Sequence, residues 1–165
     1  MINNAGILHV DEIKLGKTIR ETFETHAFAP ALVTHVFVPL LKKSSEPRIV
    51  HVSSDQGSMT ERLDKSLPHH KLQGTSYRTS KAALDKLAAC HCVDFEDWGC
   101  KVCAFNPGFM VTILTGKTGK QTRIKARAPE SSVAAAALTD VVLGKRDADI
   151  AKVGIVNLDG GLKPW

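Results

Sequence analysis

The sequence has 165 residues, of which 43% are hydrophobic and 24% are charged, with a net charge of +5. This balance is typical of one compact globular domain and excludes a disordered tail, a collagen-like repeat and a disulfide-rich miniprotein. No segment comes near the ~18 consecutive apolar residues of a membrane-spanning helix, and the first residues lack the basic and apolar regions of a secretory signal. We therefore expect a cytoplasmic protein without a membrane partner.

Strand-like and helix-like patterns alternate along the chain. The predicted elements are, in order, a strand ending near residue 6, a helix over 18–43, a strand over 48–53, an irregular stretch over 55–75, a helix over 76–98, a strand over 101–105, a helix over 129–143 and a strand over 153–158. Pro30 is expected to kink the first helix, because proline supplies no backbone N–H. Strands joined by long helices predict a parallel sheet in an α/β fold.

The excess of positive charge is confined to one segment. Residues 116–127 contain five Lys and Arg side chains and no acidic one, which accounts for the whole net charge. The segment is interpreted as a solvated, mobile loop, with a flap that attracts a phosphate or an acid as the alternative. A nucleic-acid partner is not expected, because aromatic residues make up only 5% of the chain.

The four cysteines have a spacing that is compatible with a zinc site, and they are Cys90, Cys92, Cys100 and Cys103. Cys90 and Cys92 lie ~200° apart around a predicted helix, so they cannot both face one metal ion. Cys100 and Cys103 lie on or beside a strand and tend to point to opposite faces. We therefore predict buried, reduced thiols and no metal site.

Polar and glycine-bearing segments follow three of the predicted strands, at residues 3–6, 53–54 and 106–108. In parallel α/β sheets, ligands bind outside the carboxyl ends of the strands. These segments are therefore expected to meet at one edge and to form a binding site there.

The next helix begins with a pair of residues suited to proton transfer. Tyr77, the only tyrosine of the chain, and Lys81 are four residues apart and share one helix face. A nearby cation favours the phenolate and lowers the pKa of a tyrosine. A tyrosine tuned in this way could exchange a proton with a carbonyl or hydroxyl oxygen, and Ser53 or Ser54 could hydrogen-bond the same oxygen. A Tyr-Lys pair with this spacing is common on solvated helices and is a weak signal by itself. The signal is stronger here because the pair follows a strand that ends in Ser-Ser.

Taken together, these motifs resemble the short-chain dehydrogenase/reductase family over essentially all 165 residues. The resemblance implies that Ser54 polarises the substrate oxygen, that Tyr77 is the catalytic acid/base, and that Lys81 lowers the pKa of Tyr77 and binds the nicotinamide ribose. It also implies that Tyr77 and Asn4, at the end of the first strand, contact the cofactor. Met110 and Thr112 would do so as well, in a segment with Pro107 and Gly108 that touches the nicotinamide.

The resemblance implies an NAD(P)H-dependent oxidoreductase with a Ser-Tyr-Lys site, which reduces a ketone or aldehyde of a small molecule or oxidises the alcohol. The cofactor would be NADP or NAD, with NADP favoured. Carbonyl reductases and secondary-metabolite ketoreductases are the most similar branch, and a homo-oligomer is expected if the fold is complete.

The sequence departs from the family at two places. His26 stands where the family usually has a helix asparagine that holds a water for proton relay, so it is either a relay group or a structural histidine. No Gly-x-x-x-Gly-x-Gly turn occurs in the sequence, so the N-terminal dinucleotide-binding βαβαβ unit is expected to be absent. Residues 1–165 are then a single partial domain, the C-terminal half of a doubly wound parallel Rossmann-like sheet with flanking helices. The alternative to an enzyme is a non-catalytic truncated remnant that interacts with a full-length relative.

Overall fold

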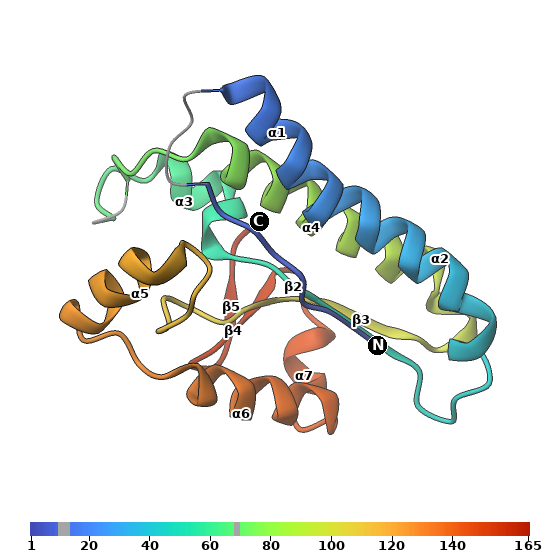
Figure 1. Cartoon of the computed structure of the whole chain (residues 1–165). Coiled ribbons are helices and arrows are strands. Elements are labelled where there is room, and N and C mark those ends of the chain that lie inside the picture. The colour runs from blue at the N-terminus through green and yellow to red at the C-terminus, as the bar shows by residue number, and fades with distance from the viewer. Residues whose placement is uncertain (10–13, 68–69) are drawn as a thin grey trace.

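The computed structural model describes residues 1–9, 14–67 and 70–165. Within them, one sheet holds the strands side by side in chain order (Figure 1). The strands are β1 (Ile2–Asn3), β2 (Arg48–Val52), β3 (Lys101–Asn106), β4 (Ile155–Asn157) and β5 (Leu162–Lys163). The first four are parallel, which confirms the predicted α/β sheet, whereas β5 is antiparallel to β4 and lies beyond the last strand that the sequence predicts.

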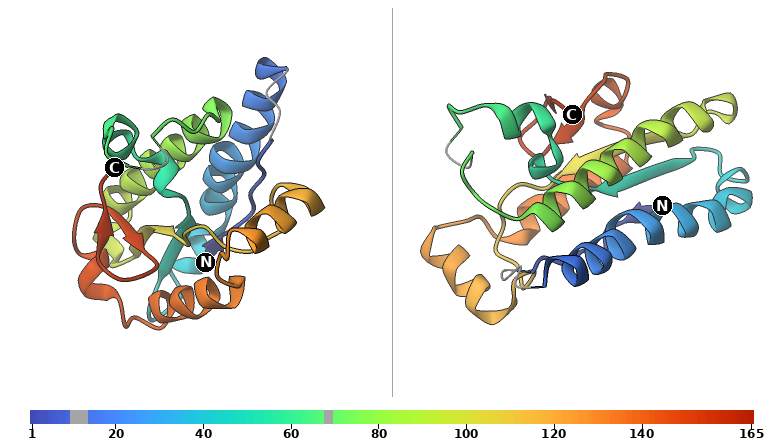
Figure 2. Two further views of the ribbon diagram at one scale, coloured as in Figure 1. Left: turned by 90° about the vertical axis from the view of Figure 1, so that its left-hand side faces the viewer. Right: turned by 90° about the horizontal axis from the view of Figure 1, so that it is seen from above.

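Helices cover both faces of the sheet (Figures 1 and 2). They are α1 (Leu15–Phe23), α2 (Ala29–Leu41), α3 (Met59–Leu63), α4 (Thr75–Asp94), α5 (Gly116–Lys125), α6 (Ser131–Val142) and α7 (Asp147–Ile150). Helices α1, α2 and α4 run along one face, and α6 and α7 lie against the other. None of the described helices is long and apolar enough to cross a membrane.

Alternate residues of the central strands fill two separate layers of the core, as the two-residue period of a strand requires. On the α6 and α7 side, Val50 and Phe105 pack against Val141. On the other face, Ala104 packs against Ala88 of α4, while Ile49 and Val102 pack with side chains from α2 and the end of α4. The middle of β2 and β3 is therefore mostly apolar on both faces, and the buried His51 of β2 is a polar exception that contacts His91 of α4.

The first long helix is interrupted where proline was expected to disturb it. A π-helical turn over Glu24–Phe28 separates α1 from α2, and Pro30 lies in the first turn of α2. A proline at this position has no N–H to give to the preceding turn, which favours a local change of the hydrogen-bond pattern. The interruption brings the buried His26 into the middle of the wider turn.

Three predictions about irregular segments and thiols were wrong. The basic segment is not a loop, because α5 spans most of it. The stretch 55–75 contains a short helical turn over Asp55–Gly57 and the helix α3. All four cysteines are free, as predicted, but Cys90 and Cys92 are exposed and only Cys100 and Cys103 are buried. No cluster of three or more metal-ligating side chains occurs in the described residues.

Candidate active site

A cleft of about 860 Å³ opens at the carboxyl edge of the parallel strands. It is lined by residues that directly follow three strands, among them Asn4 after β1, Ser54 after β2 and Pro107 after β3. Tyr77, Met110 and Thr112 line the same cleft. Five of the six residues singled out for catalysis or cofactor contact thus share one cleft, and Lys81 is the one that does not line it.

Tyr77 lies in the first turn of α4 and is 8% exposed. Burial raises the pKa of its hydroxyl to about 12, since a phenolate is poorly solvated there. The neighbouring Ser54 side chain and the charge of Arg123 act against this and lower the pKa. The expectation that Lys81 lowers the pKa of Tyr77 below its usual value does not hold here, because burial outweighs the nearby favourable groups.

Lys81 lies one helical turn after Tyr77 and is directed toward the end of β2. Its Nζ donates a hydrogen bond of 2.8 Å to the carbonyl oxygen of Val52 and lies 5.7 Å from the centroid of the Tyr77 ring. Burial lowers the pKa of Lys81 to about 8, while the carboxylate of Asp85 raises it. The side chain therefore ties α4 to β2 directly beneath the phenol.

Ser54 occupies the turn that leaves β2. Its Oγ donates to Asp55 Oδ1 at 3.1 Å and accepts from the backbone N–H of Gln56 at 3.2 Å, which caps the following helical turn. These contacts fix the hydroxyl on the cleft wall beside Tyr77. Ser53, the other candidate, is only 2% exposed.

The segment after β3 is shaped by its glycine. Gly108 has a φ of +74°, a left-handed conformation that favours glycine, and its N–H donates to the Asn106 side chain at 3.2 Å. Met110 and Thr112, which follow this turn, line the cleft together with Asn4. The cleft has room for a small aromatic ring such as a nicotinamide, whereas the 165 residues contain no glycine-rich turn for a diphosphate.

His26 is fully buried between the N-terminal segment and α4. Its Nε2 accepts a hydrogen bond of 3.0 Å from the N–H of Ile7, so the proton of the neutral ring is on Nδ1, which donates to Ser80 Oγ at 2.8 Å. Ser80 in turn donates to the carbonyl oxygen of Tyr77 at 2.8 Å. Burial lowers the pKa of His26 to about 3. Both ring nitrogens are engaged in hydrogen bonds within the protein, which favours a structural histidine over a relay group.

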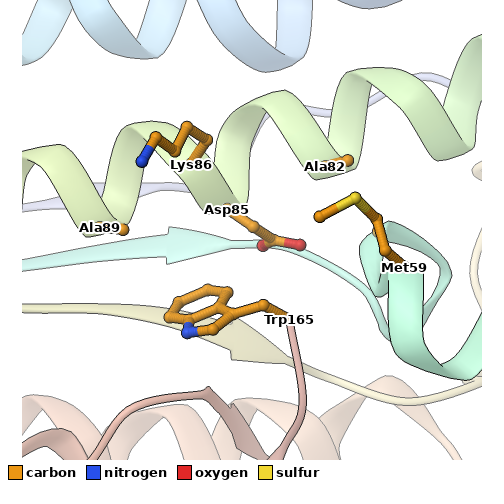
Figure 3. A pocket seen from close by; sticks show the side chains of 7 residues that line it. Met59, Ala82, Asp85, Lys86, Ala89 and Trp165 are labelled. Carbon is orange, nitrogen blue, oxygen red and sulfur yellow. The ribbon is translucent and has the colours of Figure 1, made fainter.

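Asp85 faces a second, smaller pocket beside α4. Figure 3 shows its carboxylate between Met59 and Trp165, in a pocket of about 230 Å³. Burial raises the pKa of Asp85 to about 7, and Ser53 and Lys81 act against this. Sequence reasoning missed this residue, although its position four residues after Lys81 places both on one helix face.

Arg123 is the second residue that sequence reasoning did not single out. It belongs to the basic segment, yet it is 8% exposed and lines the cleft together with Tyr77. The sequence gives little indication that Arg123 differs from the other basic residues. The segment was expected to be a loop, and a loop has no helical period from which a buried face could be predicted.

The protein has an α/β fold with a cleft at the carboxyl ends of parallel strands, where ligands bind in sheets of this kind. Comparisons with known proteins identify the family within the α/β class. The profile of the short chain dehydrogenase family matches residues 1–123. The chain belongs to this family.

Individual relatives are similar over most or all of the chain. The short-chain dehydrogenase/reductase tropE of Talaromyces stipitatus is 28% identical over 177 residues, which cover 100% of this chain and 65% of that protein. Human 17-beta-hydroxysteroid dehydrogenase type 2 is 32% identical over 129 residues, 76% of this chain and 30% of that protein. The crystal structure of NADPH-bound carbonyl reductase from chicken fatty liver has a TM-score of 0.79 and 26% identity, over 99% of this chain and 64% of that one. The chain thus spans less than two thirds of the length of these relatives.

Proposed function

We propose that this chain carries the catalytic half of an NAD(P)H-dependent oxidoreductase that reduces a ketone or aldehyde of a small molecule, or oxidises the corresponding alcohol. The observation that carries the proposal is the meeting of Ser54 and Tyr77 on one cleft at the carboxyl edge of the sheet. Family membership supports the same reaction class.

Tyr77 would act as the proton donor in the reducing direction. With its pKa raised to about 12, the phenol is protonated at neutral pH and can give its proton to the carbonyl oxygen. Ser54 would hydrogen-bond the same oxygen and stabilise the charge that develops on it. A reduced nicotinamide bound beside Asn4 and Thr112 would supply the hydride to the carbonyl carbon. The positive charges of Lys81 and Arg123 would stabilise the tyrosinate that remains.

The proposed cofactor is NADP, with NAD as the alternative. Asn4, Met110 and Thr112 would hold the nicotinamide end, and Lys81 would bind its ribose after leaving the Val52 carbonyl. The chicken relative was solved with NADPH, which supports this choice. The diphosphate would need a segment that is not among these 165 residues.

Further assignments concern the substrate, the assembly and the location. The likeness to carbonyl reductases supports a small ketone as the substrate, of the kind that secondary-metabolite ketoreductases reduce. Exposed apolar side chains of α2, including Leu32, Val36 and Leu40, support a homo-oligomer. The free cysteines support a reducing compartment such as the cytoplasm.

Replacing Tyr77 tests the proposal. Tyr77→Phe retains the ring but removes the transferable proton, so turnover of an aldehyde with NADPH should fall by roughly 10²–10⁴-fold. Cofactor affinity, measured by calorimetry, should change little. Thr79→Ala, on the exposed side of the same turn, is the matched control and should retain activity. Full activity in Tyr77→Phe would refute the assigned role.

The second candidate is a non-catalytic remnant, favoured by the lack of a glycine-rich turn in the sequence. Calorimetric titration with NADPH and with NADH separates the two. Binding in the micromolar range supports the enzyme, whereas no heat at millimolar cofactor would exclude catalysis by this chain and favour the remnant.

A further inference from the structure

The basic residues of the α5 segment fall into two groups that the sequence does not separate. Four of them are exposed to solvent, namely Lys117, Lys120, Lys125 and Arg127. Arg123 alone is buried, with 8% of its surface exposed, and it alone among the five lines the cleft. Solvation explains the four exposed cations, but it does not explain a guanidinium in the cleft wall.

The contacts of Arg123 hold its side chain in place without neutralising its charge. Its Nη1 donates to the hydroxyl of Thr115 and to the carbonyl oxygen of Gly119, the latter at 3.3 Å. The guanidinium carbon lies 5.2 Å from the centroid of the Phe109 ring. Within the parts of the chain that the structure describes, no carboxylate pairs with Arg123, and its Nε and Nη2 make no hydrogen bond to protein.

A buried cation without a counter-charge is costly, because desolvation is not repaid by an ion pair. The cost falls when an anion enters the site, and the planar guanidinium still has two nitrogens with free N–H groups to bind it. Asp55, which also lines the cleft, accepts a hydrogen bond from Ser54 and makes no ion pair with Arg123. Its carboxylate therefore does not occupy the free side of the guanidinium.

Arg123 also lies near the proposed reaction centre. It shares the cleft with Tyr77 and Ser54, and its charge is felt at the Tyr77 hydroxyl. It projects from α5, whereas the residues assigned to the nicotinamide follow the ends of β1 and β3. An anionic group held by Arg123 would consequently belong to the molecule that fills the α5 side of the cleft.

We propose that Arg123 binds an anionic group of the substrate, so that the chain acts on carbonyl compounds that carry a carboxylate or a comparably acidic substituent. This inference rests on the proposed oxidoreductase function. Arg123 would be a specificity-determining residue, fixed by Thr115, Gly119 and Phe109 so that little side-chain entropy is lost on binding.

A matched pair of aldehydes tests the proposal. The ratio of kcat/KM for para-carboxybenzaldehyde to that for its methyl ester is measured with the wild-type protein, Arg123→Gln and Lys120→Gln. We expect the wild type to prefer the carboxylate by roughly 10-fold or more, the usual range for a charge-assisted hydrogen bond. Arg123→Gln should lose this preference, and Arg123→Lys should retain part of it. Lys120→Gln removes the same charge from the exposed side of the helix and should retain the preference.

A binding measurement separates this proposal from the proposed function. If neither aldehyde is turned over, the oxidoreductase proposal fails, and calorimetry with benzoate and benzamide still tests the anion site. Benzoate should bind more tightly than benzamide, and Arg123→Gln should abolish the difference. Equal binding of the two probes would overturn the inference. So would a loss of NADPH affinity in Arg123→Gln as large as the loss for benzoate, because Arg123 would then serve the cofactor.

Discussion

Helices α4 and α5 line the same cleft but hold their polar side chains in opposite ways. Helix α4 buries Tyr77, Ser80 and Lys81 in its first two turns, and Ser80 and Lys81 each bond to a neighbouring element. Helix α5 buries Arg123 alone and exposes its other cations. The comparison indicates that the proposed chemistry is built into the core, whereas substrate preference lies on a peripheral helix that can vary at little cost in stability.

Of the changes that compare α4 with α5, replacing Lys81 of α4 should have the largest effect on turnover. Lys81→Met removes the ammonium that bonds to Val52 and lies beneath Tyr77, so we expect turnover to fall by roughly 10²-fold or more and cofactor affinity to fall with it. Lys86→Met, on an exposed position of the same helix, is the matched control. Steady-state rates and cofactor titration give the two readouts, and unchanged cofactor affinity would contradict the ribose contact.

The next effect in size concerns the His26 contacts that support α4. His26→Ala removes the acceptor of the Ile7 N–H and the donor to the Ser80 oxygen, and it opens a cavity next to Tyr77. We expect a loss of about 2–4 kcal/mol in the free energy of unfolding, measured with urea. His35→Ala replaces an exposed histidine of α2 and should cost little. A stable variant whose only defect is slow proton transfer would instead favour the relay.

Sequence reasoning predicted the parts of the fold that follow from the hydrophobic period of strands and helices and from the residues at strand ends. The strands around residues 50 and 103 and the helix from Tyr77 onward are strongly patterned, and the polar segments after the strands pointed to the sheet edge at which the structure has a cleft. The strand β5 was missed because two residues carry no usable period.

Other features depend on three-dimensional packing that no local pattern reports. The side chain of His26 in the π-helical turn is held by Ile7 and Ser80, which lie in distant segments of the chain. The helix α5 was missed because lysine, threonine and glycine give no apolar stripe, although Arg123 finds its partners one and two turns earlier in that segment. The pKa of Tyr77 was misjudged for the same reason, since burial cannot be read from the Tyr-Lys spacing alone.

An effect of intermediate size on stability is expected at acid pH, from the histidines packed around α4. Burial lowers the pKa of His26 and of His51, which contacts His91 of α4, to about 3, whereas an unfolded histidine titrates near ~6.5. Between these values the unfolded chain binds more protons, so stability should fall as the pH falls from ~6.5 toward 3, by at most about 1.4 kcal/mol per pH unit for each imidazole.

Asp85 should oppose this trend. Burial raises its pKa to about 7, so the folded state holds the extra proton above the usual carboxyl pKa, and stability from this group falls as the pH rises toward 7. Asp85→Asn removes the contribution of this carboxyl group to the pH dependence of stability. The loss of stability as the pH falls should therefore be steeper in Asp85→Asn than in the wild type. Urea unfolding between pH 4 and pH 7 measures both slopes. Equal slopes in the two proteins would show that Asp85 is ionised throughout.

The smallest effect is expected on the exposed face of α5. Lys117→Gln and Lys120→Gln remove charges that no carboxylate in the described residues pairs with, so each should change the free energy of unfolding by less than about 0.5 kcal/mol. The same exposure predicts a weak, salt-sensitive influence on the capture of an anionic substrate, because exposed charges more than ~8 Å apart are largely screened at physiological ionic strength. A change above 1 kcal/mol would mean that α5 is as tightly coupled to the core as α4, and the division between a buried catalytic helix and a peripheral specificity helix would not hold.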